Sequence, residues 1–143
     1  MPSRAMNASL CLSIGALLSL GCGGNSSTAT ATGVVSLDGQ PLETGTVDFI
    51  PVAGTKGPAA TATIADGKFT IPAEAKLKPG KFRVEISAQR VDGKQQVMSV
   101  ATGEEVTVDR YVSIIPPRYN RDTELNASLA AGPNKLTFPL KSK

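Results

Sequence analysis

Short runs in which apolar and polar residues alternate, each followed by a turn signal, constrain the fold of this chain most strongly. In the clearest run, residues 81–88, the apolar side chains of Phe82, Val84, Ile86 and Ala88 alternate with polar ones. Because successive side chains of a strand point to opposite faces of its sheet, this run predicts a strand with one buried face. No long 3.6-residue apolar period occurs beyond the N-terminal segment, so we expect a nearly all-β domain.

Seven further runs are expected to form strands, and residues 73–77 to form one helical turn. The strand runs are residues 32–37, 46–51, 59–65, 68–71, 106–115, 123–130 and 134–141. The Asp-Gly pairs at 38–39 and 66–67 predict tight turns, because glycine tolerates a positive φ. Pro139 has no N–H for a ladder, so the last run is expected at a sheet edge. Residues 89–105 are polar and predict either a long exposed loop or a weakly ordered hairpin.

The N-terminal segment predicts a lipoprotein signal peptide over residues 1–21. Arg4 supplies a positive start, residues 8–20 are apolar but too few to span a membrane, and the small Gly21 precedes Cys22. Cleavage before Cys22 would leave its thiol to carry the lipid. The alternative interpretation is an ordinary secretory signal with an incidental cysteine.

The remaining chain divides into a tether and one domain. Residues 22–31 are rich in glycine, serine and threonine, and they predict a flexible tether with little to bury. Residues 32–143 are enough for one domain but not comfortably for two, so a single β-sandwich is expected there.

Three segments together resemble the carboxypeptidase-regulatory-like, or transthyretin-like, β-sandwich domain. They are GVVSLDGQPL at residues 33–42, IADGKF at residues 64–69 and LKPGKFRV at residues 77–84. The match covers residues 32–88 most closely. The resemblance implies one Greek-key sandwich of about seven strands and no peptidase activity, since the module is non-catalytic in that family. With Cys22 at its start, the chain is similar to the small lipoproteins of this type in planctomycete-like bacteria.

Composition argues against several classes of function. The chain has no histidine and no glycine-rich nucleotide-binding motif, so no cofactor and no metal site are expected. The formal net charge of +3 comes from scattered basic residues, so no nucleic-acid partner is expected. Carboxylate-based hydrolysis, with Asp48 and Glu85 as its best candidates, stays open as a weaker alternative to a non-enzymatic role.

Residues 116–120, Pro-Pro-Arg-Tyr-Asn, are not fully explained by the needs of a turn or a core. Arg118, Tyr119 and Asn120 are therefore the candidate interaction residues, because arginine and tyrosine are enriched at interface hot spots. The alternative is a rigid crossover in which Tyr119 packs over the sandwich and Arg118 pairs with an acidic neighbour.

These features predict a non-enzymatic, lipid-anchored β-sandwich of the cell envelope, acting as a structural or protein-interaction module. Lipid on Cys22 would attach the chain to a membrane, and an envelope protein would be its partner. Gly23, rather than an acidic residue, follows Cys22 and favours the outer membrane, on its periplasmic or surface face, over the inner one. The alternative function is an envelope carrier for a small molecule or carbohydrate, with residues 89–105 as the lip of its site.

Overall fold

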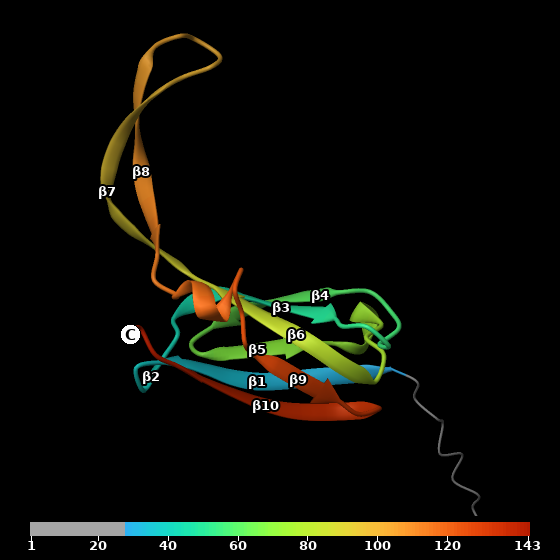
Figure 1. Ribbon diagram of the computed structural model, residues 1–143. Coiled ribbons are helices and arrows are strands. Elements are labelled where there is room, and N and C mark those ends of the chain that lie inside the picture. Colours follow the sequence, from blue (N-terminus) through green and yellow to red (C-terminus); the bar gives the residue numbers. More distant parts are fainter. Residues whose placement is uncertain (1–27) are drawn as a thin grey trace, which may run out of the picture.

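The computed structural model describes residues 28–143, which form strands and two short 3₁₀ turns (Figure 1). The strands are β1 (Ala29–Leu37), β2 (Gln40–Pro41), β3 (Thr44–Pro51), β4 (Ala60–Ala65), β5 (Lys68–Ile71), β6 (Gly80–Ser87), β7 (Gln89–Met98), β8 (Glu105–Ser113), β9 (Asn126–Leu129) and β10 (Gly132–Leu140), and the turns are η1 (Ala73–Ala75) and η2 (Pro117–Tyr119). The predicted signal peptide (residues 1–21), Cys22 and the tether as far as residue 27 lie outside the described residues.

One sheet contains eight of the strands, in the order β10-β1-β5-β4-β3-β6-β9, with the short β2 beside β1. Within it, β3, β4 and β5 are consecutive antiparallel strands, and β6 returns to pair with β3. That order is a Greek key. Only the pair of β1 with β10 is parallel within this sheet. The all-β, Greek-key fold expected from the sequence is therefore confirmed.

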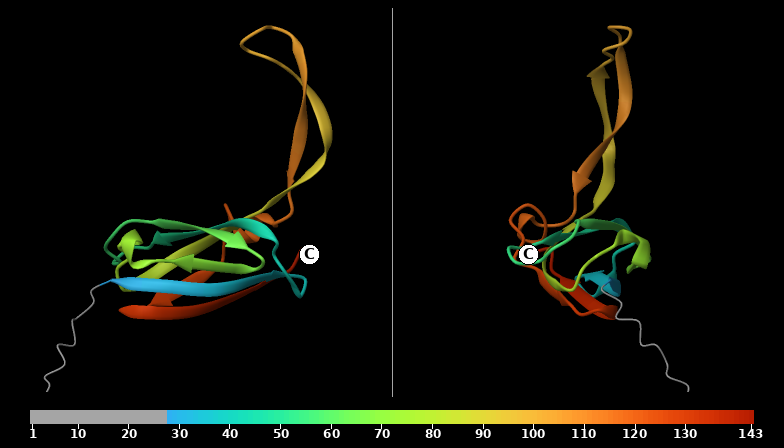
Figure 2. Two further views of the ribbon diagram at one scale, coloured as in Figure 1. Left: turned by 180° about the vertical axis from the view of Figure 1, so that it is seen from behind. Right: turned by 90° about the vertical axis from the view of Figure 1, so that its right-hand side faces the viewer.

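The sheet curls into a sandwich-like body in which residues from distant strands meet (Figures 1 and 2). The ring centroid of Phe49 on β3 lies 6.5 Å from that of Phe138 on β10, although β4, β5 and β1 separate these strands within the sheet. The ring centroids of Phe69 and Phe82 lie 5.9 and 6.2 Å from that of Phe49. These four rings occupy the space between the two layers, and their burial stabilises the curl.

The local patterns of the sequence are found in the body. Phe82, Val84, Ile86 and Ala88 are all buried, as the alternation in residues 81–88 predicts. Both Asp-Gly turns have a positive φ at their two central residues, 51° and 84° at residues 38–39 and 50° and 74° at residues 66–67. These signs are those of type I′ turns, which match the twist of a hairpin.

Strand ends differ from the expected ones where pairing partners lie far away in the sequence. β1 begins at Ala29, three residues earlier than expected, because its first residues pair with β10 and because Ala29 and Ala31 are buried. Among the described strands, β10 pairs only with β1, so Pro139 does lie in an edge strand.

β7 and β8 form a separate two-stranded sheet that projects from the body (Figures 1 and 2). We call this hairpin, residues 89–113, the arm. The long loop expected for residues 89–105 is therefore wrong. A hairpin does form, but its second strand, β8, is the run expected separately at residues 106–115. The signal was weak because neither face of the arm is buried, so its strands need no strict alternation.

Candidate functional site

The arm carries most of the exposed large hydrophobic side chains of the described chain. Eight large hydrophobic side chains are exposed in residues 28–143, and seven of them belong to the arm: Val91, Val97, Met98, Val100, Val106, Val108 and Tyr111. Single exposed apolar residues are normal on a protein surface, but a concentration on one element marks an interaction site.

The register of the arm gathers these side chains on its two faces. Val97 lies opposite Val106, and Val108 lies opposite Gln95 on the same face. Because opposed residues share a face, Val97, Val106 and Val108 form one apolar strip near the outer end. Val91 and Tyr111 form an opposed pair on the other face, nearer the body.

The backbone of the arm is also available for pairing. Within the described chain, β7 and β8 pair only with each other, so each strand leaves one edge without a ladder partner. Such edges can pair with an added strand from another chain. A β-bulge between Val91 and Lys94 interrupts the ladder, and Arg110 donates hydrogen bonds there to the Asp92 carbonyl oxygen and carboxylate, at 2.9 and 2.8 Å.

The base of the arm is fixed to the body. The N–H of Ile114 donates to the carbonyl oxygen of Ala88 at 3.1 Å, which closes the hairpin where it meets the body. Ala88 and Ile115 are buried in the core on either side of this bond. The arm therefore leaves the body at a defined position, and its outer part extends away from the rest of the described chain (Figure 2).

Of the three predicted interaction residues, Arg118 and Tyr119 hold the C-terminal segment. The Arg118 guanidinium donates to the carbonyl oxygens of Lys141 and Lys143, at 2.9 and 2.6 Å, and lies 4.9 Å from the centre of the Tyr119 ring. The hydroxyl of Tyr119 accepts a hydrogen bond from the N–H of Lys141 at 3.2 Å, and its ring packs against the core. The expected packing of Tyr119 is confirmed, but Arg118 contacts carbonyl oxygens rather than an acidic side chain.

Asn120, the third predicted residue, takes part in the turn that follows η2. Its side-chain oxygen accepts from the N–H of Arg121 at 2.6 Å, and its side-chain amide donates weakly to the carbonyl oxygen of Ile115 at 3.5 Å. All three residues are half-buried. The structure therefore brings them together, and each has an intramolecular partner.

Asp38 completes the contacts of the C-terminal segment. Hydrogen bonds from the side chain and the backbone N–H of Ser142 lower the pKa of the Asp38 carboxyl, and the positive charges of Lys141 and Arg118 lower it further. The backbone donor lies 3.0 Å from the Asp38 carboxylate. Residues 141–143 are thus held between the first turn and η2.

The two carboxylates considered for hydrolysis lie next to each other on the outer face of the body. Asp48 of β3 is directly opposite Glu85 of β6. Each has its own partner, because Thr61 donates a hydrogen bond to Asp48 and Arg83 forms an ion pair with Glu85 at 2.7 Å. In residues 28–143 no group of three or more acidic or cysteine side chains could hold a metal ion.

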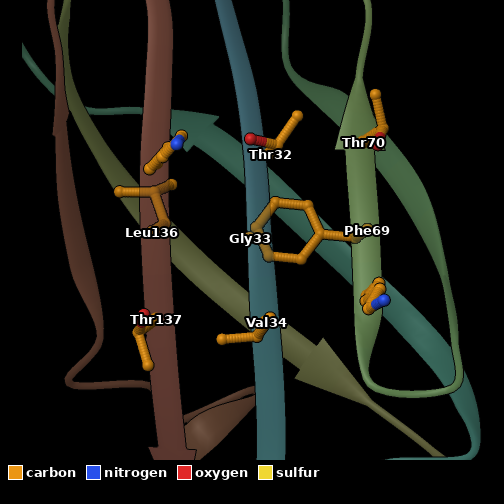
Figure 3. Close-up of a pocket in the computed structure, with 9 residues that line it drawn as sticks. Thr32, Gly33, Val34, Phe69, Thr70, Leu136 and Thr137 are labelled. Atoms are coloured by element: carbon orange, nitrogen blue, oxygen red, sulfur yellow. The ribbon is translucent and has the colours of Figure 1, made fainter.

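A second surface feature covers the outer face of β5, β1 and β10 (Figure 3). Six outward-pointing side chains surround a shallow hollow of about 350 Å³ there, and we call them the body patch: Thr32, Val34, Lys68, Thr70, Lys135 and Thr137. Val34 is the one exposed large hydrophobic residue of the described chain outside the arm. Lys68 lies opposite Val34, and Lys135 lies opposite Thr32 on the other neighbouring strand.

Gly33 supports the body patch from beneath. A Cβ atom added to Gly33 would lie 2.5 Å from Cε1 of Phe69 and 2.7 Å from the carbonyl oxygen of Leu136. Glycine is therefore needed here so that the Phe69 ring can lie against β1 (Figure 3).

No family model, curated protein or solved structure matches this chain. The resemblance to the carboxypeptidase-regulatory-like domain therefore stays a prediction. None of the helical segments among the described residues is long and apolar enough to cross a membrane.

Proposed function

We propose that this chain is a non-enzymatic, lipid-anchored module of the cell envelope that binds a protein partner through its arm. The observation that supports this most is that seven of the eight exposed large apolar side chains in residues 28–143 lie on one projecting hairpin. An isolated two-stranded hairpin is only marginally stable in water, and its open edges invite unwanted pairing. A partner that covers the strip of Val97, Val106 and Val108 would offset both disadvantages.

The position of the arm suits a chain that is anchored at the other end of the body. β1 begins at Ala29 at one end of the body, and the arm leaves the body at the opposite end (Figures 1 and 2). Lipid on Cys22, seven residues before Ala29, would therefore hold the body near a membrane while the arm extends from the opposite end of the body. The outer membrane is the favoured location of this anchor.

The alternative role as a carrier has weaker support. Four phenylalanine rings fill the space between the layers, where sandwich carriers would hold an apolar ligand. The hollow at the body patch is shallow and lies at the surface (Figure 3).

Photo-crosslinking in the native envelope tests the proposed function. A photoreactive amino acid at Val108 should give discrete protein adducts, while the same group at Thr61, an exposed residue of β4, should not. A variant in which Asn-Gly replaces residues 91–111 closes the hairpin at the Arg90–Val112 pair, and it should no longer copurify with the protein found in the adducts. Equal adduct patterns from Val108 and Thr61 would contradict the proposal.

Anchoring needs its own measurement. The Cys22→Ala variant should move from the membrane fraction to the soluble fraction, because the lipid would have no thiol to attach to. Retention of this variant in the membrane fraction would contradict the anchor and leave the arm proposal untouched.

A further inference from the structure

The outer end of the arm combines exposed apolar side chains with negative charge. Met98 and Val100 are 64 % and 107 % exposed, Glu104 lies in the turn that follows β7, and Glu105 begins β8 opposite Met98. The turn is held by hydrogen bonds between Ser99 and Glu104 and between Gly103 and Ser99, at 2.8 and 2.7 Å. We call Met98, Val100, Glu104 and Glu105 the arm tip.

The body patch combines one exposed apolar side chain with positive charge. Val34 is 44 % exposed and is flanked by Lys68 and Lys135 on the neighbouring strands. Within the part of the chain that the structure describes, neither of these lysines forms an ion pair, and neither do Glu104 and Glu105. Each surface therefore has at least one exposed apolar side chain beside two uncompensated charges, and the two surfaces complement one another.

The arm tip cannot reach the body patch of its own molecule. All three ribbon views show the arm rising from the side of the body opposite to β1 and β10, where the body patch lies (Figures 1 and 2). A tip that contacts a body patch must then belong to another molecule.

We propose that the arm tip docks on the body patch of a second copy of this chain. This inference rests on the proposed function and names the partner of the arm. Met98 and Val100 cover Val34, while Glu104 and Glu105 pair with Lys68 and Lys135. Because tip and patch are different surfaces, the contact either forms twice in a two-fold dimer or repeats head-to-tail into a ring or a chain.

Charge reversal on the full chain in a mild detergent tests this contact by sedimentation velocity. The Glu104→Lys/Glu105→Lys variant and the Lys68→Glu/Lys135→Glu variant should each weaken self-association at least about tenfold, because like charges then face each other. The variant with all four changes should regain the affinity of the unaltered chain. Rising ionic strength should weaken association of the unaltered chain and of the fourfold variant alike.

Lys56→Glu/Lys81→Glu is the matched control, because it makes the same change of charge at exposed body positions outside the patch. It should associate like the unaltered chain. Two milder variants, Glu104→Gln/Glu105→Gln and Val34→Thr, test the contact if a reversed charge impairs folding. Each of them should also weaken self-association.

Two results would overturn the inference: an unaltered chain that stays monomeric at all accessible concentrations, or a fourfold variant that associates no better than its parents. If the chain is monomeric but Val108 still gives adducts with a different envelope protein, the second-copy assignment fails and the proposed function stands. If both the association and the adducts are absent, both fail.

Discussion

Single side chains close the body where its curled sheet ends. β9 and β10 lie at the two ends of the strand order, yet only Ala130 and Ala131 join them. Asn134 spans this junction. Its side-chain oxygen accepts from the N–H of Ala130 at 2.9 Å, and its amide donates to the carbonyl oxygens of Ala130 and Thr30, at 2.9 and 3.0 Å. One amide thus connects β1, β10 and the segment after β9.

We predict that Asn134→Asp destabilises the body by about 1–3 kcal/mol, because the carboxylate cannot donate and faces carbonyl oxygens. Urea unfolding at neutral pH measures the effect. Asn126→Asp is the matched control, since the Asn126 amide donates only to the Glu124 carbonyl at an exposed site. An equal loss in both variants would contradict the role given to Asn134.

Asp38 makes the attachment of the C-terminal segment sensitive to acid. Its pKa is lowered in the folded chain, chiefly by hydrogen bonds from Ser142. Between the lowered pKa and the unfolded pKa, the folded state therefore binds fewer protons than the unfolded state. Its stabilising contribution is therefore complete above the unfolded pKa of about 3.9 and is lost as the pH falls through the lowered value. We predict that protection of the Ser142 amide from exchange falls in the unaltered chain below about pH 4, and that Asp38→Asn reduces this protection at pH 6 and removes its pH dependence. A Ser142 amide whose protection does not change with pH would contradict this.

At the scale of elements, the arm and the body rest on different interactions. The inner body strands are held by ladders on both sides, and all the longer body strands bury side chains in the core, whereas the arm has one ladder and no buried face. Polar substitutions on the arm should therefore affect binding without affecting the stability of the body.

We predict that replacing Val97, Val106 and Val108 by threonine changes the free energy of unfolding of the body by less than about 0.5 kcal/mol. With the photoreactive group moved from residue 108 to Gln95, which lies opposite it, the same triple variant should abolish the adducts formed through the arm. Val84→Thr is the stability control, because it places a hydroxyl in the core and should cost about 1–3 kcal/mol. Unfolding by urea and by heat measures the loss of stability in each variant.

At the scale of the molecule, Phe49 joins strands that are far apart in the sheet. Its ring contacts Phe69, Phe82 and Phe138, which come from β5, β6 and β10. We predict that Phe49→Ala lowers the free energy of unfolding by about 3–5 kcal/mol, since it empties the space that both layers share. Phe49→Leu should cost much less. If Phe49→Ala cost no more than Phe49→Leu, the two layers would not depend on this ring.

The local features of this fold follow from neighbouring residues, and they could be predicted from the sequence. Alternation in residues 81–88 determines which side chains of β6 are buried, because a strand has a period of two. The Asp-Gly pairs determine two turns, because few residues accept a positive φ. The strands of the arm gave a weak signal, since a segment with no buried face has no pattern to maintain.

Only the tertiary structure decided which distant residues meet. The parallel pairing of Ala29–Leu37 with Gly132–Leu140 and the contact of Asn134 with Thr30 join positions about a hundred residues apart. No local pattern encodes them, because they depend on how the sheet curls around four phenylalanine rings. The arm with its exposed strip, and the body patch that brings Val34, Lys68 and Lys135 together from three strands, arise in the same way.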